Sequence, residues 1–314
     1  MTAGVLTWRP LTDDDVPAWA RLLAAAEEVD DTGEMFAEDD LRDDLDDPSL
    51  DLATDSVAVL DGSELVAYQS PCGRARPRAS GTRWAATAWC IRDGAGRGIG
   101  TALVQRGLER AAAAEAILMV RVPDNDAGAA ALCTAAGMRA ERWWSDLRRD
   151  LAEPVAPVGL PAGIELVSLG PDYDHERWDE HVRAAHNIAF AQHWGSAQVG
   201  AESWRSQRTA VAAFRAAYSA VALDGEAIAA YLLGYEYPAP GEGRELYVAT
   251  IGTLPQWRGR GLAGALLTHV LQAAQADGIT TSVLTVDSQN ATGALGVYER
   301  VGYVPYRRAV TWIR

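Results

Sequence analysis

ELYVATIGTLPQWRGRGLAGALLTHVLQAAQADG, residues 245–278, contains a strand, a glycine-rich turn and a helix in one continuous run. The β-branched residues of 245–254 predict the strand, and the helical periodicity from residue 263 ends at Gly278. A glycine turn that opens a helix exposes unpaired N–H groups at the positive end of the helix dipole. The run therefore predicts an anion site, with phosphate as its natural occupant.

The same pattern occurs twice in the chain. VAVLDGSELVAY at 57–68 recurs as VALDGEAIAAY at 221–231, and in both the Asp-Gly pair predicts a hairpin. GRGIGTAL at 96–103 recurs 163 residues later as GRGLAGAL, and LCTAAGM at 132–138 recurs 165 residues later as VYERVGY. A repeat of this period predicts two homologous domains, each with mixed α/β order.

A proline-rich segment separates the two copies. Pro154, Pro157 and Pro161 remove backbone donors and favour extended chain. We therefore predict an N-terminal domain at 1–152, a linker at 153–163 and a C-terminal domain at 164–314. A length of 314 residues fits two domains of average size.

The bulk composition excludes several classes of partner. A formal net charge of −15 disfavours nucleic acid and anionic membrane surfaces. No apolar run reaches the length of a membrane span, and the N-terminus resembles no secretory signal, so we expect a cytoplasmic protein. The three cysteines match neither a disulfide framework nor a zinc site, so no metal is expected. The sequence carries no signal for an oligomeric state.

The turn at 255–263 is neither a dinucleotide fingerprint nor a Walker loop, since it lacks both spacings. Arg258-x-x-Gly261-x-Ala263, with Asn290 and a Tyr298-x-x-x-Gly302-Tyr303 stretch downstream, resembles the GNAT acyltransferases. The resemblance covers both halves of the chain. It implies two tandem GNAT domains and an acyltransferase that uses acetyl-CoA.

The resemblance also implies which residues contact the cofactor. In the family this loop binds the pyrophosphate of coenzyme A, and an Asn in the downstream region contacts it. The positions carried over are Ile251, Gly252, Thr253, Arg258, Gly259, Arg260, Gly261, Leu262, Ala263, Gly264, Asn290 and Tyr298.

Transfer of an acyl group from a thioester to an amine requires a base, a polarised carbonyl and a stabilised thiolate. Family resemblance places Tyr298 near the sulfur as the general acid, although a tyrosine that packs the last helix would fit the pattern too. Glu245 is the candidate base, or else an exposed glutamate at a strand start. Regular alternation would place Glu245 on one face with Tyr247, Ala249, Ile251 and Thr253, unless a bulge intervenes. A main-chain N–H near 251–253 would polarise the carbonyl.

The N-terminal copy lacks these side chains. Ala95 replaces Arg258, Cys133 replaces Tyr298, and residues 84–91 contain no acid. Its glycine turn survives, so we expect an inactive domain with a possible second cofactor site at Gly96, Arg97, Gly98, Ile99, Gly100 and Thr101.

The acceptor region is expected at 181–208. His186, His193 and Trp194 are candidate substrate-binding residues, and ordinary packing of an amphipathic helix is the alternative for each. The stretch from Asn187 to His193 resembles the mycothiol synthase branch of the family, whose members acetylate a cysteinyl amine on an inositol-bearing sugar. The loop after His193 lacks the acid expected there, so Glu38 is a further candidate.

Three functions are compatible with these observations. The first is N-acetylation of a primary amine on a small molecule through a ternary complex, and mycothiol synthesis is a special case of it. The second is acetylation of a protein or peptide. The third is a CoA-binding pseudoenzyme, against which the joint presence of Glu245, Asn290 and Tyr298 argues.

Overall fold

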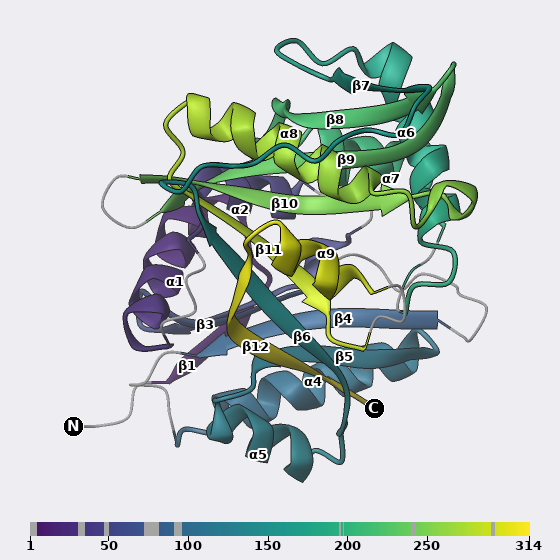
Figure 1. The fold of residues 1–314 in the computed structure, drawn as a ribbon. Coiled ribbons are helices and arrows are strands. Elements are labelled where there is room, and N and C mark those ends of the chain that lie inside the picture. Colours follow the sequence, from purple (N-terminus) through teal and green to yellow (C-terminus); the bar gives the residue numbers. More distant parts are fainter. Residues whose placement is uncertain are drawn as a thin grey trace. The chain divides into compact units, whose positions relative to one another are not determined.

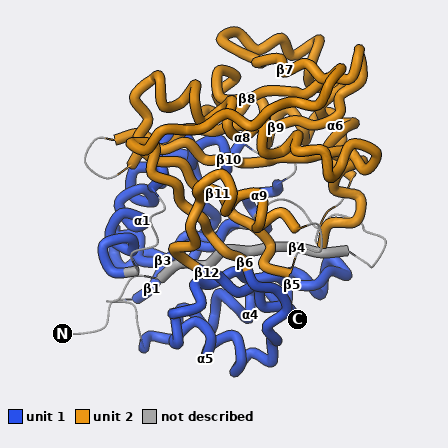
Figure 2. The backbone as a smooth tube through the Cα atoms, viewed as in Figure 1, with its two compact units in different colours: residues 1–143, 308–314 blue, residues 144–307 orange. Residues whose placement is uncertain are grey.

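The computed structural model describes residues 5–30, 35–46, 50–71, 82–90, 96–194, 196, 198–239, 243–289 and 293–314, with the main chain alone for 30, 71 and 82–90. The chain forms two compact units (Figure 2). Unit 1 contains residues 1–143 and 308–314, and unit 2 contains residues 144–307. Each unit consists of a mixed sheet and its helices, which confirms the predicted α/β class.

Unit 2 contains the strand, glycine-rich turn and helix of residues 245–278. Its sheet has the order β6-β11-β10-β9-β8-β7, in which β10 and β11 are parallel and their neighbours antiparallel. Its elements are part of β6 (Arg139–Asp150), β7 (Ile164–Ser168), α6 (His175–Ala189), α7 (Ala201–Trp204), the π-helical turn η3 (Arg205–Thr209), β8 (Phe214–Asp224), β9 (Ala227–Ala239), β10 (Gly243–Thr253), η4 (Pro255–Trp257), α8 (Leu262–Ala276), β11 (Thr281–Asp287), α9 (Ala294–Arg300) and part of β12 (Val304–Ile313).

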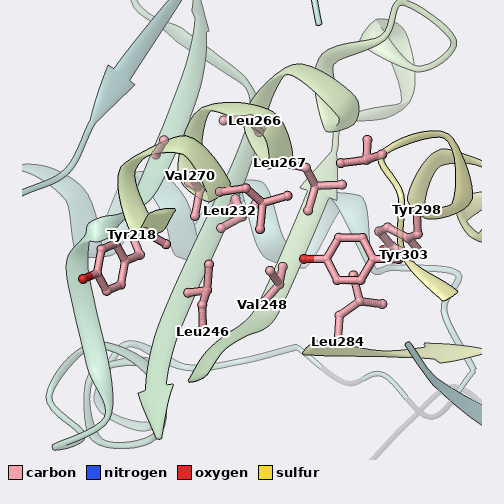
Figure 3. Close-up of a cluster of buried hydrophobic side chains, with 14 of the residues drawn as sticks. Tyr218, Leu232, Leu246, Val248, Leu266, Leu267, Val270, Leu284, Tyr298 and Tyr303 are labelled. Carbon is pink, nitrogen blue, oxygen red and sulfur yellow. The ribbon is translucent and has the colours of Figure 1, made fainter. Parts of the chain in front are cut away.

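Helices cover both faces of the unit 2 sheet (Figure 1). On one face, α8 and α9 pack Leu266, Leu267 and Tyr298 against strand residues such as Val248 (Figure 3). On the other face, α6 and α7 contribute a second buried cluster around Trp204. Burial on both sides accounts for the nearly continuous apolar sequence of β9.

Unit 1 has the sheet order β1-β2-β3-β4-β5-β12, with β4 and β5 parallel. Its helix α1 packs Trp19 and Leu22 against β2 and β3. Its elements are β1 (Leu6–Arg9), η1 (Asp13–Asp15), α1 (Val16–Asp30), α2 (Glu38–Leu45), α3 (Leu52–Asp55), β2 (Val57–Asp61), β3 (Glu64–Pro71), β4 (Thr82–Cys90), α4 (Ile99–Ala113), β5 (Ala116–Pro123), α5 (Ala127–Ala135), and parts of β6 and β12.

The strand registers show the repeat in three dimensions. The hairpin pair Asp61↔Glu64 corresponds to Asp224↔Ala227, with an offset of 163 at both positions. The parallel pair Thr82↔Ala116 corresponds to Glu245↔Thr281, with offsets of 163 and 165. Both predicted Asp-Gly hairpins form, since Gly62 and Gly225 adopt φ of +63° and +61°.

The last strand of each copy belongs to two units. β6 begins in unit 1, and its residues 144–150 pair with β11 of unit 2. β12 begins in unit 2, and its residues 309–313 pair with β5 of unit 1. The compact units therefore do not coincide with the two repeats, and the sequence boundaries at 152 and 164 stay a prediction about the repeats.

The proline-rich segment packs against α8 rather than standing free. Leu151 and Val155 are buried in the cluster beneath that helix. Gln272 donates to the Val155 carbonyl at 2.8 Å, and the Val158 N–H donates to the Thr268 hydroxyl at 3.2 Å. The segment is thus an ordered part of unit 2, held by side chains of one helix.

The close packing of β9 against β8 can be tested at Gly234. A Cβ at Gly234 would overlap the Tyr218 carbonyl oxygen, because β8 and β9 approach closely there. We expect Gly234→Ala to lower the free energy of unfolding by about 1–3 kcal/mol in urea titrations. Gly264→Ala is the control, because a Cβ there would sit 3.6 Å from Val158 and alanine favours helices. Equal stability of Gly234→Ala and wild type would contradict the close approach.

Candidate functional site

The two parallel strands of unit 2 separate at the site. Their register contains Glu245↔Thr281 and ends at Tyr247↔Val283. Beyond that point β11 continues to pair with β6, and β10 continues to pair with β9. Within the described residues no pair joins β10 to β11 after Tyr247, so main-chain polar groups on this edge of β10 are available to a ligand.

A β-bulge at Ala249 changes which side chains share a face of β10. The register with β9 shifts between Val248 and Thr250. Val248 faces the cluster beneath α8, and after the bulge Ile251 packs against the same cluster. Regular alternation, which would have kept Glu245, Tyr247, Ala249, Ile251 and Thr253 on one face, therefore fails beyond Ala249. The alternative that a bulge changes the face is confirmed, because one extra residue reverses the alternation.

The glycine loop forms an open cradle at the start of α8. Gly259 and Gly261 adopt φ of +73° and +84°, and a Cβ on either would meet no atom within 4 Å. The first main-chain N–H bonded at the start of α8 is that of Ala265, which donates to Gly261 at 3.0 Å. The N–H groups of 262–264 precede that bond, and among the described residues none accepts from them. The loop therefore offers several donors to an anion at a helix N-terminus.

The two arginines of the loop lie in different environments. Arg258 donates to the Thr253 carbonyl at 3.1 Å and to the Ala189 carbonyl, at the end of α6, at 2.9 Å. Its guanidinium thus ties the loop to β10 and α6. Arg260 is exposed, and no described residue pairs with its side chain. Arg260 is the cation of this loop that remains available to a ligand.

Glu245 lies where the two parallel strands still pair. Its side chain is largely buried, and Arg148 Nη2 lies 3.7 Å from its carboxylate. Burial raises the pKa of Glu245 to about 7, although Arg148 and Arg307 oppose the rise. A carboxyl group with this pKa can take up and release a proton near neutrality.

Tyr298 lies on α9 in the cluster beneath α8, beside Tyr303 (Figure 3). Their ring centroids are 6.3 Å apart. Burial raises the pKa of Tyr298 to about 12, with a smaller contribution from Tyr247. The Tyr298 hydroxyl makes no hydrogen bond with the described residues, and it stays protonated at neutral pH.

Tyr303 helps to hold β10 and β11 together just before the two strands separate. Its hydroxyl and the Ser282 hydroxyl form a hydrogen bond of 2.7 Å, and Ser282 donates to the Leu246 carbonyl at 3.1 Å. Gly302, just before it, adopts φ of +90° and has the Arg149 guanidinium beside it. The Tyr-x-x-x-Gly-Tyr stretch thus connects α9 to the last paired residues of β10 and β11.

The predicted acceptor residues fall into two groups. His186 is buried, with its Nδ1 2.6 Å from the Tyr231 hydroxyl and its ring stacked on Phe190. Burial lowers its pKa to about 3, so it is uncharged. His193 and Trp194 are partly exposed and lie within about 6.4 Å of Trp144, measured between ring centroids.

Sequence reasoning missed Trp144. It belongs to β6, outside the repeat that contains the other candidates, and only the pairing of β6 with β11 brings it to His193 and Trp194. Asn290 lies outside the described residues. Glu38 begins α2 in unit 1, is exposed and forms an ion pair of 2.7 Å with Arg42.

The N-terminal copy repeats the cradle without the reactive groups. Gly96 and Gly98 adopt φ of +80° and +77° ahead of α4, so the predicted turn forms. Arg97 of that turn forms an ion pair with Asp61 at 2.6 Å. Cys133, the counterpart of Tyr298, is buried, and burial raises its thiol pKa to about 11. Ala95 lies outside the described residues.

Among the described residues, no helix is both long and apolar enough to cross a bilayer. In the same part of the chain, no group of three or more His, Cys, Asp and Glu side chains is placed to hold a metal ion.

Comparison with known proteins assigns the family. The model of the acetyltransferase (GNAT) family matches residues 176–303. A mycothiol acetyltransferase of Frankia alni is 30% identical over 333 residues, which cover 98% of this chain and 94% of the relative. A second, from Frankia casuarinae, is 30% identical over 235 residues, which cover 70% of this chain and 65% of that relative. The match thus spans just under two thirds of the Frankia casuarinae protein.

Solved structures share the fold over the whole chain. A GCN5-related N-acetyltransferase from Sphaerobacter thermophilus has a TM-score of 0.76 at 24% identity, covering 98% of this chain and 95% of its own. A tandem GNAT protein from the clavulanic acid biosynthesis pathway has a TM-score of 0.71 at 21% identity, covering 99% and 98%. The chain belongs to the GNAT acetyltransferase family, and it shares its fold with a tandem GNAT protein over almost its full length.

The environment of Glu245 can be tested directly. Removal of the Arg148 charge should raise the pKa of Glu245 above 7, because that cation stabilises the carboxylate form. We expect Arg148→Met to show this in a carboxyl carbon NMR titration. Arg244→Met is the control, because Arg244 pairs with Glu236 instead. An unchanged or lowered pKa in Arg148→Met would contradict the described contact.

Proposed function

We propose that the chain transfers an acyl group, most simply acetyl, from acyl-CoA to a primary amine of a small molecule, with both substrates bound together in the C-terminal copy. The proposal depends on one observation, the combination of three features within unit 2. The N–H groups of the glycine loop are open at the start of α8, β10 carries Glu245 and separates from β11, and Tyr298 lies on α9. This combination supplies a site for a diphosphate and two groups that exchange protons.

The residues of the loop fit the phosphates of coenzyme A. Bulkier residues at Gly259 and Gly261 would occupy space that is open in this structure, and both positions need positive φ. The N–H groups of 262–264 and the Arg260 guanidinium would hold the pyrophosphate. Acetyl-CoA supplies the acyl group as a thioester. Ile251 and Thr253 lie beyond the last pair between β10 and β11, and an N–H group of this stretch would polarise the thioester carbonyl.

Glu245 would act as the general base. An amine acceptor reaches the enzyme largely as an ammonium ion, and a carboxylate with a pKa near 7 can accept its proton. Arg148 is the more exposed partner of the Arg148–Glu245 ion pair. Its positive charge opposes the rise in the pKa of Glu245, so part of the Glu245 carboxyl groups stay ionised at neutral pH.

Tyr298 would act as the general acid. Its hydroxyl retains its proton at neutral pH and has no partner among the described residues, so that proton can be donated to a departing thiolate. In the N-terminal copy Cys133 and Thr82 replace Tyr298 and Glu245. For this reason we assign catalysis to the C-terminal copy and a structural role to the other.

The acceptor would enter beside His193, Trp194 and Trp144, which are all partly exposed. The ring centroids of His193 and Trp194 lie 6.4 Å and 6.3 Å from that of Trp144. Two relatives described above are named mycothiol acetyltransferase, which favours the thiol precursor of mycothiol as one specific acceptor. Aromatic faces of this kind suit a sugar ring or a small cation.

A thiol-release assay with acetyl-CoA and a panel of primary amines tests the proposal. We expect turnover with at least one small amine, and a loss of about 10²-fold or more in kcat for Tyr298→Phe, because the variant cannot donate a proton. Cys133→Ala, the matched change in the N-terminal copy, should retain the wild-type rate. Absence of thiol release with every amine, or full activity of Tyr298→Phe, would refute the assignment.

The pH dependence tests Glu245 separately. Because the base must be ionised, kcat/KM should rise with pH through about 7 and then level off. Glu245→Gln should lower kcat/KM by about 10²–10⁴-fold and remove this inflection. A profile of unchanged shape in Glu245→Gln would show that another group titrates.

A further inference from the structure

The two copies differ in how the hairpin carboxylate next to the glycine loop is paired. With the offset of 163, Asp61 corresponds to Asp224, and Arg97 corresponds to Arg260. At the same offset, Gly94 is the counterpart of Trp257 in the N-terminal copy. Each copy thus has a carboxylate at the hairpin and an arginine in the loop, but only the C-terminal copy has an indole between them in the sequence pattern.

In the N-terminal copy the carboxylate pairs with the loop arginine. Arg97 Nη1 lies 2.6 Å from Asp61 Oδ2. The two side chains are 24% and 34% exposed, so solvent screens the pair only in part. A phosphate that approached this loop would have to displace a carboxylate from the arginine.

In the C-terminal copy the carboxylate has a different partner. The Trp257 indole N–H donates to Asp224 Oδ2 at 3.0 Å. The Trp257 ring packs against both hydrophobic clusters of unit 2, which fixes the direction of its N–H. Arg260, the counterpart of Arg97, has no partner among the described residues.

We propose that Trp257 is a positioning residue that holds the Asp224 carboxylate away from Arg260, so that this guanidinium stays available for the phosphates of acyl-CoA. An indole suits this role because it is an uncharged donor, which satisfies one carboxylate oxygen without adding a cation that would compete for the anion. The proposal rests on the proposed function and deepens it. By the same reasoning, the glycine loop of the N-terminal copy, whose Arg97 is paired with Asp61, should bind phosphate more weakly.

The test is calorimetric titration of the full chain with acetyl-CoA and with adenosine 3′,5′-bisphosphate at low ionic strength. Trp257→Phe keeps the ring but removes the donor, so Asp224 becomes free to pair with Arg260. We expect the Kd of both ligands to rise about two- to fivefold, the range of a partly exposed ion pair. Adding Asp224→Asn to Trp257→Phe should restore the wild-type Kd, because the amide carries no charge.

Two further variants make the result specific. In an Arg260→Gln background, which itself binds more weakly, Trp257→Phe should have no additional effect on Kd. Asp61→Asn removes the equivalent charge from the N-terminal copy, and it should leave the Kd of the C-terminal site unchanged. If Asp61→Asn rescued Trp257→Phe as well as Asp224→Asn does, the effect would reflect overall charge and the proposal would be overturned.

The outcomes separate this inference from the proposed function. If wild type binds acetyl-CoA and releases thiol but Trp257→Phe binds with unchanged Kd, the positioning role is wrong and the acyltransferase assignment stands. If wild type binds neither ligand, both fail. A weaker Kd that the Asp224→Asn change does not restore would also overturn the proposal, because it would point to lost packing of the ring.

Discussion

The separation of β10 from β11 after Tyr247↔Val283 is the constraint on which the site depends. Paired strands satisfy their own polar groups, and strands that part leave main-chain donors to be satisfied by a ligand. The bulge at Ala249 shifts the register of β10 with β9 just beyond that pair, while the Tyr303–Ser282–Leu246 hydrogen bonds hold the last paired residues together. The N–H cradle of the glycine loop, Glu245 and Tyr298 all belong to one compact unit.

The N-terminal copy has the same backbone arrangement with different side chains around it. Strands β4 and β5 also pair in parallel, Ala85↔Met119 is their last pair within the described residues, and the loop before α4 has similar positive φ angles. The N-terminal copy thus keeps the backbone features, which depend on glycine positions and register. Its side chains differ at each reactive position, and its loop arginine is occupied by Asp61. Backbone geometry alone therefore does not make the site, because charge and proton transfer depend on side chains.

Much of this could be predicted from the sequence. Asp-Gly pairs gave both hairpins, the repeat gave the tandem architecture, and α8 ends before Gly278 as its periodicity indicated. These features depend on local conformational preferences, which each residue carries with it. The resemblance to GNAT proteins gave the family, because its motif is a run of neighbouring residues.

The remaining features depended on residues far apart in the chain. Burial raises the pKa of Glu245, and Arg148, which lies on a strand of the other repeat, opposes that rise. Trp144, on the same strand as Arg148, lies near His193. The buried position of His186 and the pairing of Asp224 with Trp257 likewise required the packed structure. Sequence by itself determined the repeat, the hairpins, the glycine cradle and the family, since these are local patterns. Only the tertiary structure decided that β6 and β12 each belong to both compact units. It also decided the raised pKa of Glu245 and the availability of Arg260, because strand pairing, burial and charge pairing are set by neighbours in space.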